Sequence, residues 1–299
     1  MKIKEVHIEK FKRFTDLVIK NIPQSTKLVI LLGPNGCGKS SVFDAFKTWH
    51  RVKAYNYGTD NEYCKKDKRD IREACDLVNI VFHEDTSNIL QNEMKKCFYF
   101  RTAYRNSPYI TVNAIQQIPS PLETPDEKKM IDNDSSVDDD YQRLISSTLD
   151  KIYDERNDSS KVKDIREEII GKIRGSMERL FPDLLLSGIG LPTEKAEFYF
   201  EKGQTKSYEY EKLSGGEKAA FDLLLDLVVK SDIYDDTIFC IDEPETLKSV
   251  ANDICTDLKK LFQLMRCGNN GESIMRDTIC GLITEDMDTY QELRQDIFE

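Results

Sequence analysis

Apolar and polar residues alternate along the chain in patterns that predict an α/β protein. The N-terminal segment Lys2–Phe11 alternates like a half-buried strand. An apolar run over Leu28–Leu32 precedes a glycine-rich loop and then helical spacing over Ser41–Val52, which predicts a strand–loop–helix unit of parallel-sheet character. The segments Asp76–Glu84 and Lys96–Arg105 predict two further strands, which can pair with the first.

The middle of the chain changes from apolar to acidic composition. Residues Pro119–Asp140 are rich in proline, serine and acidic side chains, which predicts a loop or disordered connector. Helical periodicity follows over Tyr141–Arg156 and Val162–Phe181 and is broken near Asn157–Ser160. We therefore expect a helical pair in this region.

The last third of the chain returns to mixed strand and helix patterns. Alternation over Ala196–Leu213 predicts a hairpin that turns at Lys202–Gln204. A helix from about Gly216 to Lys230, a strand over Thr237–Ile241 and a helix within about Leu247–Met265 are expected after it.

Composition and charge narrow the class of protein. The 299 residues fit one large domain or two small ones, and a net charge of −11 fits a well-solvated surface. No long apolar run or signal peptide occurs, so we expect a cytoplasmic protein without a membrane partner. The acidity argues against a duplex DNA binder that relies on overall charge, although a local basic face would still allow DNA binding. The eight cysteines form no CxxC pair, which favours reduced thiols.

One glycine-rich segment, GPNGCGKS over Gly33–Ser40, fits the phosphate-binding pattern G-x-x-x-x-G-K-S in full. Glycines let backbone N–H groups turn inward around an anion, and the helix that follows adds the partial positive charge of its N-terminus. Lys39 can reach the β- and γ-phosphates, and the Ser40 hydroxyl can ligate Mg²⁺. We expect ATP and Mg²⁺ as cofactors, with nucleotide contacts from Asn35, Gly36, Cys37, Gly38, Lys39, Ser40 and Ser41.

A second motif, LSGGEK, begins at Leu213 and predicts a helix start with Ser214 near its N-cap and two glycines that allow close approach to phosphate. This hexapeptide resembles the signature motif of ABC-type ATPases, and it lies in the expected order after the phosphate-binding loop. In that class the motif completes the site of the opposite subunit. The resemblance therefore implies a head-to-tail homodimer or higher homo-oligomer with ATP between the heads, contacted by Ser214, Gly215, Gly216 and Glu217.

A third motif, IFCIDE, resembles a Walker B strand that ends in an acidic pair. Asp242 would hold Mg²⁺, mostly through water, and Glu243 would orient and deprotonate the attacking water as the catalytic residue. An acidic pair at a strand end is common by itself. Its position after LSGGEK and before Pro244 favours the catalytic interpretation and an ATP hydrolase.

The three motifs together imply an α/β fold, namely an ABC-type P-loop ATPase head with an N-terminal β subdomain and a short helical or coiled-coil insertion. One head would span residues 1–299. We expect an N-terminal lobe with the P-loop over residues 1–118, an acidic linker and helical insertion over 119–182, and a C-terminal lobe with the signature and Walker B motifs over 183–299.

The segment IEKFKRF, with the DEPE that contains the acidic pair, resembles the non-transporter branch of this class, which includes SMC, RecF and overcoming-lysogenization-defect heads. In that branch an N-terminal basic loop can contact nucleotide, so Lys12 and Arg13 are candidates, with a solvated basic turn as the alternative. Gln116 or Gln117 could sense Mg²⁺ and the attacking water, with a surface polar pair as the alternative. We take Gln116 as the candidate metal-site residue.

The segment Phe98–Tyr109 resembles bacterial anti-phage ATPases of this branch, most like the AriA-type ATPase subunit of the PARIS system. The short spacing between Ser40 and Leu213 excludes long coiled-coil arms. The resemblance implies a toxic effector protein as partner, released when a phage trigger protein is sensed. Arg101 and Arg105 predict either a phosphate or nucleic-acid contact or solvated arginines on an edge strand.

Three other functions fit parts of the pattern. A RecF-type DNA-repair head would bind DNA in an ATP-dependent and salt-sensitive way. A transporter subunit would need a membrane partner, which the N-terminal and DEPE patterns disfavour. A scaffold that binds ATP with little turnover would use the dimer for assembly alone.

One element of the related heads is missing, because no histidine follows His83. Those heads carry a switch histidine on a strand after the acidic pair. Thr278–Asp286 could form that strand with Glu285 at the switch position, but a carboxylate adds like-charge repulsion beside the γ-phosphate. Either the switch is lost and hydrolysis is slow, or residues between about Glu245 and Leu247 are missing from this sequence.

Overall fold

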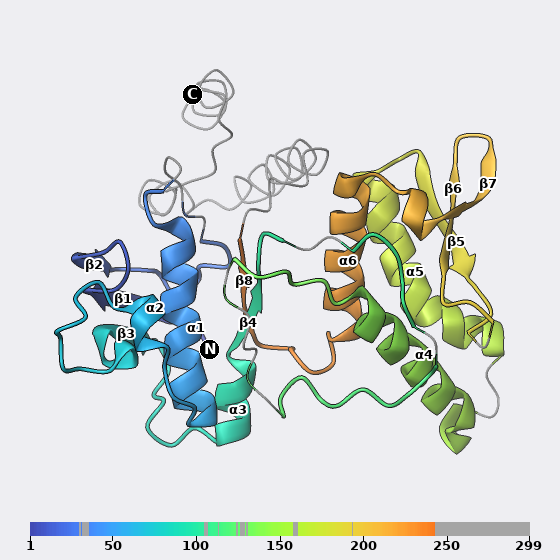
Figure 1. Ribbon diagram of the computed structural model, residues 1–299. Coiled ribbons are helices and arrows are strands. Elements are labelled where there is room, and N and C mark those ends of the chain that lie inside the picture. The colour runs from blue at the N-terminus through green and yellow to red at the C-terminus, as the bar shows by residue number, and fades with distance from the viewer. Residues whose placement is uncertain are drawn as a thin grey trace, which may run out of the picture.

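The computed structural model describes residues 1–29, 31, 36–104, 107–112, 114–123, 125, 129, 131–157, 161–192 and 194–242, which form a mixed α/β structure with two lobes (Figure 1). The strands are β1 (Ile3–Glu9), β2 (Asp16–Ile19), β3 (Val78–Phe82), β4 (Phe98–Arg101), β5 (Leu184–Ile189), β6 (Phe198–Lys202), β7 (Thr205–Glu209) and β8 (Ile238–Ile241). The helices are α1 (Lys39–Tyr55), α2 (Asn61–Cys64), α3 (Gln91–Lys96), α4 (Val137–Tyr153), α5 (Val162–Leu180) and α6 (Gly215–Val229), with short 3-10 turns η1 (Ala74–Leu77), η2 (Glu155–Asn157) and η3 (Tyr210–Lys212).

The first lobe is built on an antiparallel sheet with the strand order β2–β1–β3. Alternate residues of β1, Val6 and Ile8, are buried, as a half-buried strand requires. The apolar face of α1 supplies Phe46 and Trp49 to the same core, and Trp49 contacts Phe82 of β3 with ring centroids 5.8 Å apart. The predicted strand at Lys2–Phe11 and the helix that follows the glycine loop are confirmed.

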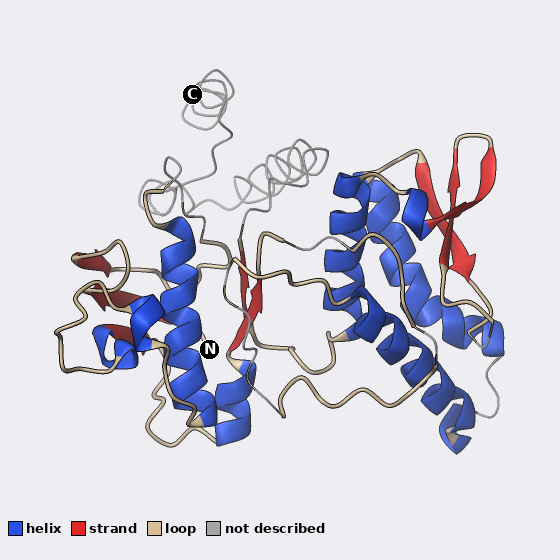
Figure 2. Cartoon of the chain, in the orientation of Figure 1, coloured by secondary structure: helices blue, strands red, loops and turns tan. Residues whose placement is uncertain are grey.

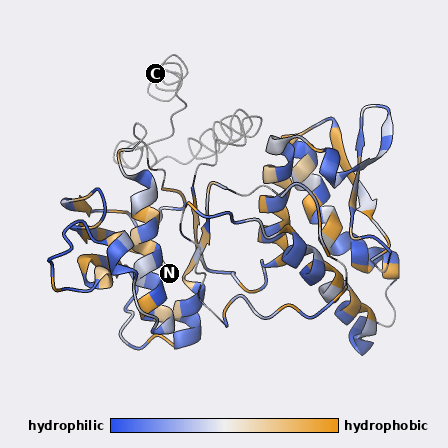
Figure 3. Ribbon diagram, in the orientation of Figure 1, coloured by the Kyte–Doolittle hydropathy of each residue, from blue (hydrophilic) through white to orange (hydrophobic). Residues whose placement is uncertain are grey.

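The second lobe packs α4, α5 and α6 beside the antiparallel sheet β5–β6–β7 (Figure 2). Its core is centred on Phe198, Phe200 and Phe221, whose rings meet at centroid distances of 4.8 and 5.2 Å. The hairpin turns at Gly203, which has a φ of +59° that favours glycine. Figure 3 shows apolar and polar residues mixed along these helices, as expected for elements with one buried face. The predicted hairpin, helical pair and following helix are confirmed.

The two lobes meet at a two-stranded parallel sheet formed by β4 and β8. Phe98, Phe100 and Cys240 point into the core of the first lobe. The alternate residues Tyr99 and Arg101 therefore point to the opposite face, toward α6. The expected pairing of the β4 segment with the first strand is wrong, since its partner is β8, whereas β3 does pair with β1.

Two sequence expectations differ from the structure in detail. In the expected strand over residues 28–32, the described residues Leu28, Val29 and Leu31 belong to no strand, and Leu28 and Val29 expose 50% and 51% of their surface. Only Leu31 of these three packs against the core of the first lobe. The connector expected to last until Asp140 ends earlier, because Val137 is buried against the second lobe and begins α4.

The predicted helix within residues 247–265 and the strand at 278–286 lie outside the described residues. Among the helices that are described, none combines the length and the apolar character that crossing a membrane requires.

Candidate nucleotide-binding site

The P-loop ends in a helix start that has no side-chain cap. Gly36 and Gly38 have φ values of +79° and +112°, and Gly38 is the N-cap residue of α1. Because glycine has no side chain, the first N–H groups of α1 are not capped by their N-cap residue, and such groups attract anions. Lys39 and Ser40 form the first turn of this helix. Gly33, Pro34 and Asn35 lie outside the described residues.

A basic turn lies directly over this loop. A Cβ atom placed on Gly36 would be 3.4 Å from Nη2 of Arg13, and one on Gly38 would be 2.8 Å from Cζ of Phe14. Only glycine fits this close approach at Gly38, where the added atom would overlap the Phe14 ring. The Arg13 side chain is exposed and forms no ion pair with any residue that the structure describes, so its charge can serve an anion held by the loop.

The neighbouring Lys12 has a different environment. Its ammonium forms an ion pair with the buried Asp44 of α1 and lies 3.5 Å above the centre of the Tyr63 ring. Tyr63 also donates a hydrogen bond to Asp44 at 3.1 Å. Lys12 therefore anchors the basic turn to α1, and of the two candidates it is Arg13 that lies over the P-loop.

The sequence patterns did not identify Lys66, which supports this turn. Its Nζ donates hydrogen bonds to the Arg13 carbonyl at 3.3 Å and to Oγ1 of Thr15 at 2.5 Å. The turn is also held by the hydrogen bond from Lys12 N–H to the Cys64 carbonyl at 2.8 Å. A basic run around Lys66 is visible in the sequence, but nothing in its spacing connects it with residues fifty positions earlier.

The signature segment forms a capped helix start. Oγ of Ser214 accepts a hydrogen bond from Glu217 N–H at 3.3 Å, and the Glu217 carboxylate accepts one from Ser214 N–H at 2.8 Å. Burial opposes ionisation of Glu217, but the hydrogen bonds from Lys202 and Ser214 and the charge of Lys202 together outweigh it and lower the pKa of this carboxyl. Ser214 and Gly215 remain exposed, so this helix start is accessible from outside the lobe.

The described parts of the three motifs lie on the same side of the molecule. Helices α1 and α6 both begin on the upper side in Figure 1, and β8 ends on that side. The strand end carries Asp242, which is 5% exposed and whose N–H donates a hydrogen bond to the Arg101 carbonyl at 3.0 Å. Glu243 follows it and lies outside the described residues.

The glutamine pair lies against the second lobe. Gln116 and Gln117 are exposed, and the N–H of Gln116 donates a hydrogen bond to Oε1 of Gln142 in α4 at 3.2 Å. Its role at a metal stays a prediction.

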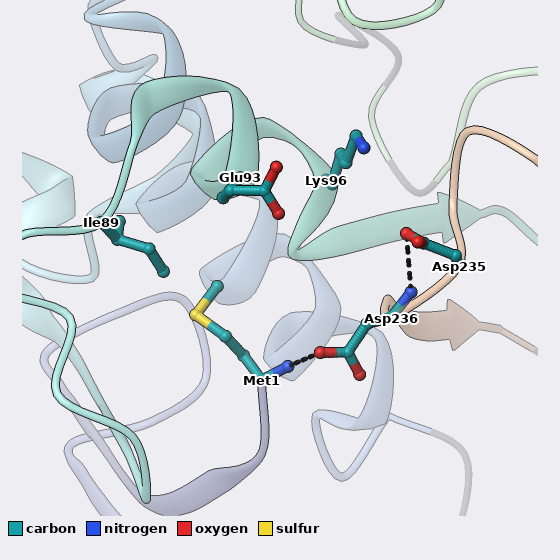
Figure 4. A pocket seen from close by; sticks show the side chains of 6 residues that line it. All are labelled: Met1, Ile89, Glu93, Lys96, Asp235 and Asp236. Atoms are coloured by element: carbon teal, nitrogen blue, oxygen red, sulfur yellow. Dashed lines mark hydrogen bonds and ion pairs between the residues drawn. The ribbon is translucent and has the colours of Figure 1, made fainter.

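A small pocket lies at the other end of β8. It is lined by Met1, Ile89, Glu93, Lys96, Asp235 and Asp236, and the N-terminal ammonium forms a 2.6 Å ion pair with Asp236 across it (Figure 4). Asp235 and Asp236 precede β8, whereas Asp242 follows it, so this pocket is separate from the P-loop side. Among the described residues no group of histidine, cysteine or acidic side chains could hold a metal ion, and the described cysteines are free thiols.

The structure contradicts both interpretations that the sequence allowed for Arg101. Its side chain is 1% exposed and forms ion pairs with Asp134 at 2.9 Å and with Asp226 of α6 at 2.5 Å. Arg101 is therefore neither a phosphate or nucleic-acid contact nor a solvated arginine. Arg105 lies outside the described residues.

Two carboxyl groups near this arginine have raised pKa values. Burial raises the pKa of Asp222 to about 8, although the Tyr210 hydroxyl donates a hydrogen bond to it at 2.8 Å. Burial and the charge of Asp226 raise the pKa of Asp140 to about 7, against the opposing effect of Lys230. The folded protein therefore holds protons on these groups at pH values where the unfolded chain has released them.

This difference predicts a stability that falls as pH rises. Because the two folded-state pKa values lie above the unfolded value, the stabilisation is lost as pH rises through about 7 and 8. We expect the free energy of unfolding to be about 2–3 kcal/mol lower at pH 8.5 than at pH 6.5. Urea denaturation at both pH values measures this difference. Asp222→Asn should remove more than half of it, and the exposed control Asp235→Asn should leave it unchanged; an equal difference in both variants would contradict the assignment.

Comparison with known proteins bears on the N-terminal part of the chain. A family model described as an AAA domain matches residues 1–51, which include β1, the basic turn, the P-loop and most of α1. No curated protein matches the chain. The match supports a nucleotide-binding ATPase of AAA type, for which ATP and usually Mg²⁺ are the ligands. It does not extend to α6 or β8.

Proposed function

We propose that this protein is an ABC-type ATPase that binds Mg·ATP at the P-loop and hydrolyses it in a head-to-tail dimer. The observation that carries the proposal is the common orientation of the three motifs, since the starts of α1 and α6 and the end of β8 all lie on one side. A second copy that faces this side head to tail brings its own α6 start toward the P-loop.

Each motif has a role in this proposal. Lys39 and the N–H groups of α1 bind the phosphates, and the Arg13 guanidinium adds positive charge above the same loop. Mg²⁺ held by Ser40 and Asp242 would neutralise charge on the β- and γ-phosphates. Glu243 orients and deprotonates the attacking water. Ser214 and Gly215 of the opposite subunit approach the γ-phosphate, which their exposure permits.

We further propose a role in anti-phage defence, in which the dimer holds a toxic effector and releases it when a phage protein is sensed. Support comes from the resemblance of residues 98–109 to anti-phage ATPases. Because Arg101 in that segment is buried in an ion-pair network, the resemblance concerns the architecture of the head more than an exposed contact surface. Co-purification with the product of a neighbouring gene tests this part.

Glu243→Gln tests the hydrolytic mechanism. The variant keeps the shape of the side chain but cannot accept the proton of water. ATP should therefore bind but should be hydrolysed more slowly. We expect the lifetime of the ATP-bound dimer to increase by about tenfold or more, because loss of the general base slows the hydrolysis that ends the ATP-bound state. Sedimentation velocity after dilution, together with phosphate release, measures this lifetime. Asp235→Asn, at the far end of the same strand, should behave as wild type; unchanged turnover in Glu243→Gln would refute the assignment of the base.

A DNA-repair head of RecF type is the second candidate. The exposed cations Lys66, Lys68 and Arg69 near the basic turn favour it, although Glu62 and Asp67 form ion pairs with two of them. Duplex DNA binding with and without ATP at two salt concentrations separates the candidates. A DNA-binding head requires ATP-dependent affinity that falls steeply with salt.

A further inference from the structure

The two lobes of the protein have separate apolar cores. The core of the first lobe includes Phe98 and Phe100 of β4, and the core of the second lobe is formed by α4, α5, α6 and the sheet β5–β6–β7. Between them lies a polar junction, because Tyr99 and Arg101 occupy the alternate face of β4. Ion pairs and hydrogen bonds depend on direction, so this junction fixes the orientation of one lobe against the other more narrowly than apolar contact alone.

Arg101 makes contacts in two directions. Its carbonyl accepts the hydrogen bond from the N–H of Asp242, the acid expected to hold the metal. Its guanidinium pairs with Asp226 in α6, with Asp134 through Nε, and with the Asp134 carbonyl at 3.0 Å. One residue thus connects the Walker B strand end with the helix that carries the signature motif.

The remaining members of the junction balance the charge around Asp226. Lys230 forms ion pairs with Asp226 and, at 3.1 Å, with Asp140. The Tyr99 hydroxyl donates to Asp226 at 2.7 Å, and the Ser136 hydroxyl donates to Asp140 at 2.6 Å. These groups come from β4 and from the ends of α4 and α6. In the part of the chain that the structure describes, none of them forms a hydrogen bond or ion pair with Asp242.

We propose that Arg101 is a positioning residue that couples metal–nucleotide binding at Asp242 to the orientation of the signature helix α6, an inference that rests on the function proposed above. A shift of the strand end moves the Arg101 carbonyl, and the guanidinium transmits this shift to Asp226. Asp226 lies three turns from Ser214, about 18 Å along a rigid helix. A small rotation at Asp226 therefore displaces the helix start that faces the partner subunit.

Arg101→Lys tests this coupling, because lysine keeps the charge but loses the fork that contacts both acids. We expect Mg·ATP affinity, measured below the concentration at which dimers form, to stay within about threefold of wild type. The dimer dissociation constant in Mg·ATP should rise at least tenfold, whereas in ATP with EDTA the variant and the wild type should agree. A purely structural defect would weaken dimers in both conditions.

Lys230→Met is the matched control, since it removes a buried cation of the same junction whose ion pairs, within the part of the chain that the structure describes, are with Asp226 and Asp140 and not with Asp242. It should lower stability without changing the Mg²⁺ dependence of dimer formation. Equal dimer affinities of Arg101→Lys and wild type in Mg·ATP would overturn the inference and leave the ATPase intact. If the wild type itself forms no ATP-dependent dimer, the proposed function fails instead.

Hydrogen exchange in the wild-type protein gives a second test, which does not depend on how the variants fold. At concentrations below dimer formation, Mg·ATP should slow exchange both in the P-loop and in the part of α6 around Asp226. Protection of the P-loop with no change at residues 222–230 would contradict the coupling.

Discussion

Lys39→Ala should lower ATP turnover by about 100-fold or more, because the ammonium at the start of α1 is expected to stabilise the charge on the transferred phosphoryl group. The helix start itself should survive, since Lys39 occupies its first turn and alanine is a strong helix former. Nucleotide affinity should fall together with turnover. Phosphate release and fluorescent-nucleotide binding measure the two effects.

The matched control for this prediction is Lys53→Ala. Lys53 is an exposed lysine in the last turn of the same helix, at the end away from the P-loop. It should bind and hydrolyse ATP as the wild type does. Intact nucleotide binding in Lys39→Ala would show that the glycine loop is not a phosphate site.

Arg101→Met should destabilise the protein by about 3–5 kcal/mol, because it leaves Asp134 and Asp226 buried without their shared cation. Methionine has a similar length and fits an apolar site, so the effect would come from lost charge and hydrogen bonds more than from volume. Asp226 is fully buried, and the charges of Arg101 and Lys230 hold its pKa at about 2 against the effect of burial. Loss of one of these cations raises that pKa.

Urea denaturation measures this loss, and Arg156→Met is the control. Arg156 also pairs with an aspartate, Asp154, but its side chain is 88% exposed, so its substitution should leave the denaturation midpoint unchanged. If both variants had equal midpoints, Arg101 would not hold the lobes together.

Local elements were predictable where one periodicity extended over a whole segment. The strand β1 alternates from Glu5 to Glu9, and α1, α5 and α6 have an apolar face, so their type and approximate bounds agree with the structure. The hairpin was predictable because Gly203 interrupts the alternation at its turn. These patterns are local, and local patterns are what a sequence shows directly.

Contacts between distant segments were not predictable in the same way. The pairing of β4 with β8 joins residues about 140 positions apart, and no pattern within β4 indicates its partner. Arg101 resembled a surface residue because arginine is seldom fully buried, and its acidic partners lie in a connector and on a helix. The connector was predicted from its composition, but composition gave no indication that Asp134 within it is buried.

The candidate site was predictable to the level of its motifs. The glycines, Lys39 and the capped start of α6 follow from spacing alone, whereas the position of Arg13 above Gly36 depends on a turn supported by Lys66. The sequence left open whether this basic turn contacts nucleotide or is solvated. The structure adds that Arg13 of the turn lies over Gly36 of the P-loop.

The head-to-tail arrangement is tested most directly by mixing two inactive variants, Lys39→Ala and Ser214→Arg. In a composite site, the P-loop of one subunit works with the signature helix of the other, so a mixed dimer holds one intact site. We predict that neither variant hydrolyses ATP alone and that an equal mixture recovers about a quarter of wild-type turnover, because half of the dimers are mixed and each has one of two sites. Turnover of the mixture equal to the average of the separate variants would contradict the head-to-tail arrangement.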